Sequence, residues 1–316
     1  MSLQFILGGS GSGKTYRLYK ELIRQSITEP DTRYIAIVPE QFTMQTQKEI
    51  VSLHPSHGVM NIDIVSFNRL AYRVFEELSI ENPQVLDDMG KSMVLRKVAS
   101  GKKKDLVLYQ EHLSKNGFIS QLKSMLSELY QYGVTPDMLS VNLPDSISPM
   151  LRQKLSDISV MYQGFKDYIA DKFITTEEIL DVFCRVLPQS RLMKESVITL
   201  DGYTGFTPVQ YRILGLLLRY CKQVIVTVTI DPSENMNRFL GMQELFYMSR
   251  QMIYRVTNLA EEAGISRDKD ILLTDHPAVR YTSLGEHKGK ALDFLEQNLY
   301  RYKKKTCGDT EGIRII

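Results

Sequence analysis

Short apolar runs alternate with amphipathic stretches up to residue 75 and again from residue 196 onward. The apolar runs have the length and the flanking turn residues of buried strands, and they lie at 4–7, 34–38, 61–66, 196–201, 223–230 and 271–273. Between them, apolar residues recur every three or four positions, which predicts helices at 16–23, 41–53, 67–75, 209–220, 241–264 and 287–302. Strands that alternate with helices are typical of a parallel sheet covered by helices. The sequence therefore predicts an α/β fold.

The pattern changes between residues 87 and 187, where strand-like runs vanish and helical periodicity takes over. Helices are predicted at 88–100, 106–132, 148–171 and 176–187. A block of this length exceeds an ordinary crossover connection, so we expect an inserted helical subdomain at 87–187. The α/β domain then comprises 1–86 and 188–316. Lys102, Lys103 and Lys104 form a basic turn that either contacts nucleic acid or, as is more common, is simply solvated.

Composition narrows the class of protein only slightly. The 316 residues are 43% hydrophobic, as is ordinary for a globular protein. The net charge is only +2, so any site that binds nucleic acid has to be a local basic patch and not a property of the whole surface. The three cysteines are Cys184, Cys221 and Cys307, a spacing that is typical of neither a metal site nor a disulfide scaffold. The first strand begins at once, and no apolar run approaches about 18 residues, so we expect a cytoplasmic protein without a membrane contact.

The stretch Gly8-Gly9-Ser10-Gly11-Ser12-Gly13-Lys14-Thr15 fits the phosphate-loop pattern G-x-x-x-x-G-K-[ST] at every fixed position. It lies between the first predicted strand and the first predicted helix, which is the context this motif requires. Its glycines let backbone N–H groups turn toward phosphate oxygens, and the helix adds the positive end of its dipole. We expect Lys14 to reach the β- and γ-phosphates of ATP and the Thr15 hydroxyl to hold Mg²⁺. The alternative is a flexible turn that only joins a strand to a helix.

Asp201 ends the strand predicted at 196–201, and a carboxylate in this position orders the Mg²⁺ shell in phosphate-loop proteins. A helix cap or a turn is the alternative explanation for this aspartate. Gly202 follows it, where ATPases of this design generally carry a glutamate that activates the attacking water. Because glycine offers no general base, we expect ATP and Mg²⁺ to bind with weak or absent hydrolysis, and no catalytic residue is assigned.

Another group of residues lies where strands give way to helices on the same edge of the predicted sheet. Gln41 follows the second strand, and Ser66, Phe67 and Arg69 follow the third. An aromatic ring and a cation at such a corner are suited to a stacked base and a backbone phosphate of single-stranded DNA. The alternative is that Phe67 packs the start of its helix and that Arg69 is a solvated first-turn residue.

Several stretches, in this order along the chain, resemble the N-terminal, helicase-like region of AddB. AddB is the B subunit of the bacterial ATP-dependent helicase/nuclease that processes DNA double-strand breaks, and RexB is its close relative. The stretches are the phosphate loop, Val38-Pro39-Glu40-Gln41-Phe42-Thr43, Val65-Ser66-Phe67-Asn68-Arg69-Leu70-Ala71-Tyr72-Arg73-Val74 and Asp201-Gly202-Tyr203-Thr204-Gly205-Phe206-Thr207-Pro208-Val209-Gln210. The phosphate loop marks a very large class, whereas the last two stretches look specific to this family.

The resemblance implies a RecA-like, superfamily 1 helicase domain with DNA-contacting segments at 38–43 and 66–69 and a metal aspartate at Asp201. It also implies a protein that has lost unwinding, kept a nucleotide site, and scans single-stranded DNA for the Chi recombination signal together with an AddA-type partner. The family's nuclease domain and iron–sulfur cysteines are expected in a C-terminal part beyond these residues. Working motors of this superfamily differ, because they have Asp-Glu where this chain has Asp201-Gly202.

We therefore interpret the chain as the first motor-like domain of an AddB-type protein that binds ATP-Mg²⁺ and single-stranded DNA for recombinational repair. One rival interpretation is an active ATPase or nucleotide kinase in which Glu40 orients the nucleophile. Another is a scaffold whose nucleotide site is vestigial and whose task is to dock the partner motor.

Overall fold

The structure, a computed structural model, describes residues 1–80, 84–113, 115–141, 143–144, 146–170, 172–231, 241–273, 286–299, 305–308 and 313. The end of the last predicted helix lies outside these residues. The chain divides into two compact units, one made of 1–66, 194–205 and 217–316 and the other of 67–193 and 206–216. The insertion predicted at 87–187 lies within the second unit, which also takes in flanking residues on both sides.

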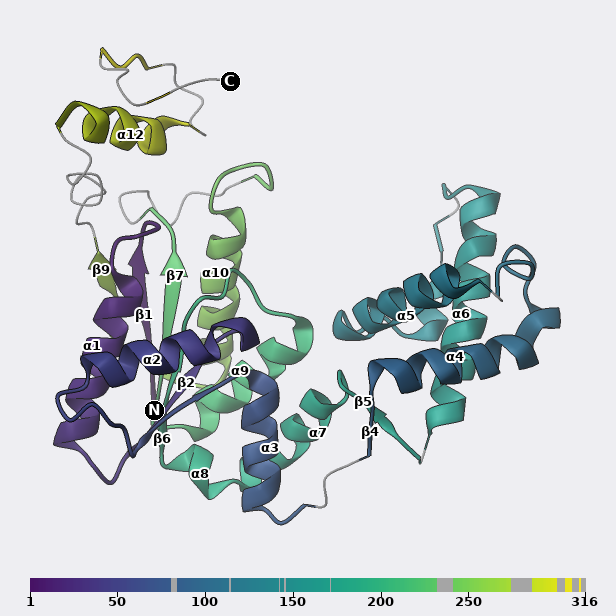
Figure 1. The fold of residues 1–316 in the computed structure, drawn as a ribbon, viewed down its shortest axis with the longest axis horizontal. Helices are drawn as coiled ribbons and strands as arrows, with labels where there is room; N and C mark the ends of the chain where they lie inside the picture. Colours follow the sequence, from purple (N-terminus) through teal and green to yellow (C-terminus); the bar gives the residue numbers. More distant parts are fainter. Residues whose placement is uncertain are drawn as a thin grey trace. The chain divides into compact units, whose positions relative to one another are not determined.

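The first unit is built on a parallel sheet (Figure 1). Its strands are β1 (Ser2–Gly8), β2 (Arg33–Ile37), β3 (Ile62–Val65), β6 (Ser196–Leu200), β7 (Gln223–Thr229), β8 (Ser266–Arg267) and β9 (Ile271–Leu273). Their order is β3-β2-β6-β7-β1, and β8 and β9 both pair with the outer side of β1. The central strands are buried on both faces, as near-continuous apolar runs require. The predicted α/β class with a parallel sheet is confirmed.

Helices cover both faces of this sheet. They are α1 (Lys14–Thr28), α2 (Thr43–Leu53), which follows a 3₁₀ turn at Glu40–Phe42, and α10 (Tyr247–Glu262); a further helix, α12 (Glu286–Asn298), comes later in the chain. The connections β1-α1-β2 and β2-α2-β3 run in one direction along the sheet, and β7-α10-β8 runs in the other. Because such crossovers are right-handed, α1 and α2 lie on one face and α10 on the opposite face. Leu18, Tyr19 and Leu22 of α1 pack with Ile50 of α2 in the core of that first face.

The second unit is helical (Figure 1). Its elements are α3 (Phe67–Glu77), β4 (Val85–Leu86), α4 (Asp88–Lys102), a 3₁₀ turn at Lys103–Asp105, α5 (Asn116–Gln131), a 3₁₀ turn at Pro136–Leu139, α6 (Pro149–Ile169), β5 (Ile174–Thr175), α7 (Ile179–Val186) and a 3₁₀ turn at Leu187–Gln189. The short helix α8 (Arg191–Lys194) ends at the boundary of this unit, and α9 (Pro208–Tyr220) contributes residues to both units. The two-stranded pairing of β4 with β5 is a feature that the sequence pattern does not predict.

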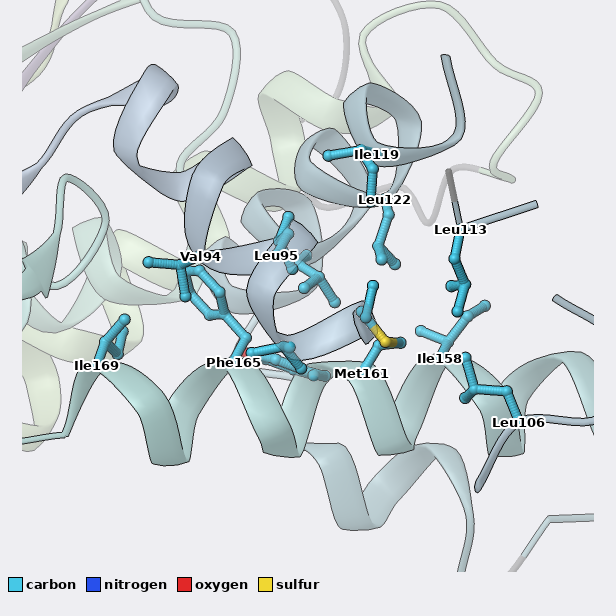
Figure 2. Close-up of a cluster of buried hydrophobic side chains, with 14 of the residues drawn as sticks. Val94, Leu95, Leu106, Leu113, Ile119, Leu122, Ile158, Met161, Phe165 and Ile169 are labelled. Atoms are coloured by element: carbon cyan, nitrogen blue, oxygen red, sulfur yellow. The ribbon is translucent and has the colours of Figure 1, made fainter. Parts of the chain in front are cut away.

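Three helices of this unit share one apolar core. Leu95 of α4, Leu122 of α5 and Met161 of α6 meet between the helices, and Ile158 and Phe165 extend the contact along α6 (Figure 2). The helical spacing of these residues places them on one stripe of each helix, so burying the stripes against one another holds the bundle together.

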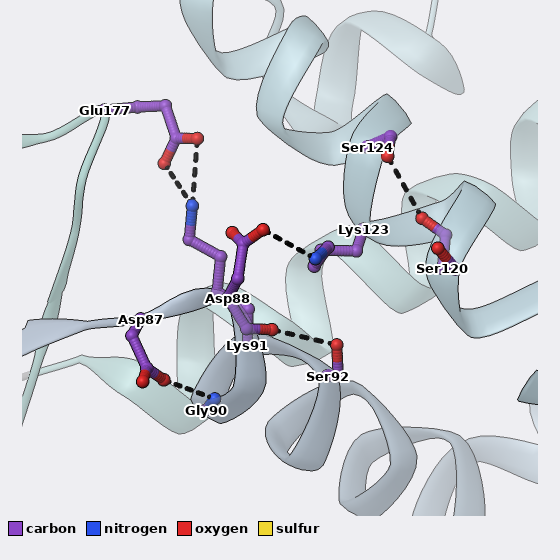
Figure 3. A network of polar contacts seen from close by, with 9 residues as sticks. All are labelled: Asp87, Asp88, Gly90, Lys91, Ser92, Ser120, Lys123, Ser124 and Glu177. Carbon is purple, nitrogen blue, oxygen red and sulfur yellow. Dashed lines mark hydrogen bonds and ion pairs between the residues drawn. The ribbon is translucent and has the colours of Figure 1, made fainter.

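A buried ion pair crosses this unit. Lys91 of α4 is 4% exposed, and its Nζ lies 2.8 and 2.9 Å from the two carboxylate oxygens of Glu177 (Figure 3). Burial opposes the charged form of Glu177, but hydrogen bonds from Lys91 and Ser127 more than offset it, so the pKa of this carboxyl lies below its usual value. The pair therefore ties α4 to the segment that precedes α7.

The predicted helix over 106–132 is wrong in its first part, because α5 begins only at Asn116. Asp157, which is 1% exposed, accepts the backbone N–H groups of Val107, Leu108 and Tyr109 at 2.8–3.2 Å. A carboxylate that binds these N–H groups offers the backbone a partner other than a helical turn. Residues 107–109 are therefore held in a non-helical conformation.

Among the helices in the described parts of the chain, none combines the length and the hydropathy that a bilayer crossing requires.

Candidate nucleotide site

The loop between β1 and α1 carries the predicted phosphate-loop pattern, and two of its glycines have left-handed backbone conformations. Gly11 and Gly13 have φ angles of 73° and 84°, in the region that favours glycine. A Cβ atom on Gly8 would lie 3.1 Å from the backbone oxygen of Leu273 and 2.4 Å from Ser12 Oγ, so a larger residue would fit here only tightly and with a shift of the Ser12 hydroxyl. No side chain caps the N-terminus of α1, and its first turn carries no acidic residue. The first N–H groups of this helix are therefore suited to an anion.

Lys14 is the first residue of α1, and its side chain folds back over the loop. Its Nζ donates to the carbonyl oxygens of Gly8 at 3.0 Å and Gly9 at 2.7 Å, and the residue is only 9% exposed. Burial lowers the pKa of the Lys14 ammonium, and the nearby Asp201 carboxylate opposes part of that shift. A phosphate at this position would supply the negative charge that a partly desolvated ammonium lacks.

Thr15 and Asp201 are 186 positions apart in the sequence and lie in contact. The Thr15 hydroxyl donates to Asp201 Oδ2 at 2.9 Å. The Asp201 backbone N–H donates to Ile37 O at 3.1 Å, which fixes the residue at the end of β6 beside β2. The Thr227 hydroxyl on β7 donates to the other carboxylate oxygen, Oδ1. The sheet thus brings a hydroxyl and a carboxylate together beside the phosphate loop.

These groups fit a magnesium ion that is shared with a nucleotide. Mg²⁺ prefers oxygen ligands and is usually held by one or two protein groups, substrate phosphates and water. Within the described residues, no group of three or more His, Cys, Asp or Glu side chains is arranged to hold a metal ion. The oxygens of Thr15 and Asp201 are therefore consistent with a Mg²⁺ site in which nucleotide phosphates and water complete the coordination shell.

A pocket of about 750 Å³ opens beside the loop. Lys14, Thr15 and Tyr19 line it from α1, and Lys48 and Glu49 line it from α2. This volume lies within the range of about 300–1,000 Å³ that small-molecule sites usually have. The phosphate loop therefore faces a space large enough for a nucleotide.

Tyr19, Thr46 and Thr227 are the polar residues around Asp201 that sequence reasoning missed. Tyr19 lies one helical turn after Thr15, so its position on the same face of α1 was the available signal. Burial raises the pKa of Tyr19 above its usual value, and the charges of Asp201 and Glu49 raise it further. Thr46 and Thr227 carry no such signal, since Thr46 reaches the site through the packing of α2 against α1 and Thr227 through the strand order.

Gly202 has a φ angle of 79°, again in the left-handed region. The Cβ atom of any other residue would lie 3.5 Å from Pro39 Cδ, which is ordinary contact, so the backbone conformation is the main reason for glycine here. The next residue, Tyr203, has a pKa raised by burial and by the nearby charge of Glu40. The position directly after Asp201 therefore carries no carboxylate, as the sequence already indicates.

The residues predicted to contact DNA differ in exposure. Gln41, in the 3₁₀ turn before α2, is exposed, whereas Ser66, directly after β3, is buried. Phe67 begins α3 and is 4% exposed, with its ring edge-on to Phe206 at 6.4 Å between centroids. Arg69 is exposed. The burial of Phe67 favours the packing alternative for this residue, and DNA contact at the others stays a prediction.

Comparisons with known proteins agree in pointing to one family. The model of the family described as "ADDB, N-terminal" matches residues 5–295. The B subunit of an ATP-dependent helicase/deoxyribonuclease from Lachnoclostridium phytofermentans is 43% identical over 308 residues, which is 97% of this chain and 26% of that protein. Proteins of the same name from Thermoanaerobacter sp. (strain X514) and Clostridium tetani are 31% and 30% identical, over 100% and 96% of this chain.

The chain spans only about a quarter of the length of these relatives, 26–27% in each case. The matched stretch includes the phosphate loop, the strands that bring Thr15 to Asp201, and the helical second unit. Because the family match covers most of its residues, this chain belongs to the AddB N-terminal family.

Proposed function

We propose that this chain is the N-terminal, nucleotide-binding region of the B subunit of an ATP-dependent helicase/deoxyribonuclease. The observation that carries the proposal is the contact between Thr15 and Asp201, 2.9 Å apart, beside a phosphate loop that opens to a pocket. The names of its relatives support the assignment to a helicase and nuclease assembly.

In this proposal the triphosphate lies against the N-terminus of α1. The orphan N–H groups of the first turn bind phosphate oxygens, and Lys14 leaves the carbonyls of Gly8 and Gly9 to reach the β- and γ-phosphates. The residues Gly8–Thr15 form the cradle, and Mg²⁺ bound by Thr15 and ordered by Asp201 neutralises phosphate charge. Gly202 provides no general base, so hydrolysis by this region is weak or absent.

We further propose that this region contacts single-stranded DNA, with Gln41 and Arg69 as its exposed polar groups. Ser66 would take part through its position at the end of β3. In the full-length protein this contact would serve scanning for a recombination signal during repair of double-strand breaks. An AddA-type helicase/nuclease subunit would be the partner, since the relatives are named as one subunit of a larger enzyme.

The test is calorimetric titration of ATP-Mg²⁺ into the chain and into two lysine variants, with phosphate release followed in the same samples. Lys14→Ala removes the loop ammonium, whereas Lys104→Ala removes an exposed lysine of the second unit. We expect saturable binding in the wild type and in Lys104→Ala, at least about 10-fold weaker binding in Lys14→Ala, and negligible phosphate release.

Two other outcomes would each support a rival function. Steady phosphate release that Glu40→Gln abolishes would indicate an active ATPase. Equal behaviour of Lys14→Ala and the wild type would indicate a vestigial site on a scaffold.

A further inference from the structure

Tyr19 connects the predicted metal site to the neighbouring helix α2. The side chain is 2% exposed, and its hydroxyl oxygen lies 3.4 Å from Asp201 Oδ2 and 3.0 Å from Thr46 Oγ1. Thr46 is 4% exposed and lies in the first half of α2. A buried chain of hydroxyl groups therefore runs from Asp201 to α2.

The direction of these hydrogen bonds follows from the chemistry of the groups. An ionised carboxylate only accepts, and a phenol has one proton to donate. Tyr19 therefore donates to Asp201, and Thr46 donates to the lone pair that Tyr19 retains. The hydrogen bonds therefore run from Thr46 to Tyr19 and from Tyr19 to Asp201.

Asp201 is held from several sides by this arrangement. Oδ2 accepts from both Thr15 and Tyr19, and Oδ1 accepts from Thr227. Thr15 also belongs to the metal site, so Tyr19 shares its acceptor atom with the hydroxyl that would hold Mg²⁺. A change of charge at Asp201 would change the strength of the Tyr19 hydrogen bond.

Helix α2, which carries Thr46, lines the same pocket as the phosphate loop. Lys48 and Glu49 of α2 line it opposite α1, and Gln45 Nε2 donates to Glu49 Oε1 at 2.9 Å. The turn at Glu40–Phe42, which contains Gln41, leads directly into α2. A shift of Thr46 would thus act on the segment that the proposed function assigns to DNA.

We propose that Tyr19 is a positioning residue that fixes Asp201 for Mg²⁺ and couples the occupancy of the nucleotide site to α2 through Thr46. This inference rests on the proposed function. When Mg²⁺ binds beside Asp201, the carboxylate becomes a weaker acceptor for Tyr19, and the Tyr19–Thr46 hydrogen bond readjusts. Residues 43–53 then respond to the metal-bound nucleotide.

The test compares Tyr19→Phe and Thr46→Val with Tyr34→Phe. Each variant keeps the shape of the side chain and removes a hydroxyl. Tyr34 belongs to the same buried core as Tyr19 and is 1% exposed, so it controls for the loss of a buried phenol away from Asp201. One measurement is the Mg²⁺ concentration at half-saturation in the presence of ATP. The other is hydrogen exchange of residues 43–53 with and without ATP-Mg²⁺.

We expect Tyr19→Phe to raise the half-saturating Mg²⁺ concentration about 10-fold. Removing a group that orients a metal ligand typically weakens metal binding by about 10–100-fold, and we expect the low end because the hydrogen bond from Tyr19 to Asp201 is long, at 3.4 Å. Binding of ATP without Mg²⁺ should be unchanged. Thr46→Val should keep Mg²⁺ binding near the wild-type value and lose most of the exchange response of residues 43–53. Tyr34→Phe should match the wild type in both measurements.

The outcomes separate the coupling from the nucleotide site itself. If the wild type binds ATP-Mg²⁺ and both Tyr19→Phe and Thr46→Val behave like Tyr34→Phe, the coupling is refuted while the proposed function stands. If the wild type binds no nucleotide, the proposed function fails first. If Tyr19→Phe does not fold, the exchange response of Thr46→Val decides, and a full response in that variant would overturn the coupling.

Discussion

Replacing Gly202 tests whether the left-handed backbone conformation at this position is the reason that a glycine follows Asp201. The φ angle is 79°, and a non-glycine residue in this region costs about 1–2 kcal/mol. A Cβ atom there would lie 3.5 Å from Pro39 and 3.9 Å from Phe42, so overlap adds nothing to that cost. We therefore expect Gly202→Ala to lower the free energy of unfolding by about 1–2 kcal/mol.

The assay is thermal and denaturant unfolding of Gly202→Ala beside Gly205→Ala. Gly205 has no positive φ angle, and its added Cβ would lie 3.7 Å from Met248, so it controls for the extra methyl group in the same loop. A loss of about 1–2 kcal/mol corresponds to a fall of the melting temperature by roughly 2–8 °C. Equal stability of the two variants would refute the argument from backbone conformation.

The same position bears on hydrolysis. Gly202→Glu would supply the carboxylate that active motors carry, yet it would hold that residue in a strained conformation. We expect this variant to be destabilised like Gly202→Ala and to gain little phosphate release. A large gain would show that the missing carboxylate alone prevents hydrolysis.

Two further predictions concern the helical unit. Asp157→Ala leaves the N–H groups of residues 107–109 without their buried acceptor, so we expect a loss of about 3 kcal/mol or more in the free energy of unfolding, measured by denaturant against the exposed Asp105→Ala. Glu177→Gln leaves the buried Lys91 ammonium without its carboxylate partner, so we expect the free energy of unfolding to fall by about 3–5 kcal/mol. Because the folded pKa of Glu177 is lowered, its contribution is complete above the unfolded value of about 4.3 and is lost as the pH falls through the folded pKa. Acid unfolding of the wild type should show that loss, and an equally steep acid transition in Glu177→Gln would contradict it.

The parts of the structure that the sequence could predict are those with strong local signals. Apolar runs indicated the central strands, because a strand buried on both faces has few polar residues. The phosphate loop is also local, since its glycines and its helix start lie in one stretch. The sequence predicts Asp201 near Thr15 only if their strands share one sheet, and in the structure the two residues are in contact.

The parts that could not be predicted depend on distant residues. Asp157 determines the conformation of a segment about fifty positions earlier, and helical periodicity there gives no sign of it. Tyr19 and Thr46 look like ordinary members of amphipathic helices, and their role follows from the packing of α1 against α2 beside Asp201. Gly202 indicates a lost carboxylate in the sequence, whereas the structure adds a backbone reason for glycine.

The most direct test of nucleotide binding without turnover is the melting temperature of the chain with and without ATP-Mg²⁺, measured together with phosphate release. A ligand at about a hundred times its dissociation constant stabilises the folded state by about 2.7 kcal/mol. We predict a clear upward shift with no phosphate released, and a shift in Lys14→Ala that is about half as large or smaller, since about 10-fold weaker binding reduces the stabilisation to about 1.4 kcal/mol. An unchanged melting temperature in the wild type, or steady phosphate release, would contradict the proposal.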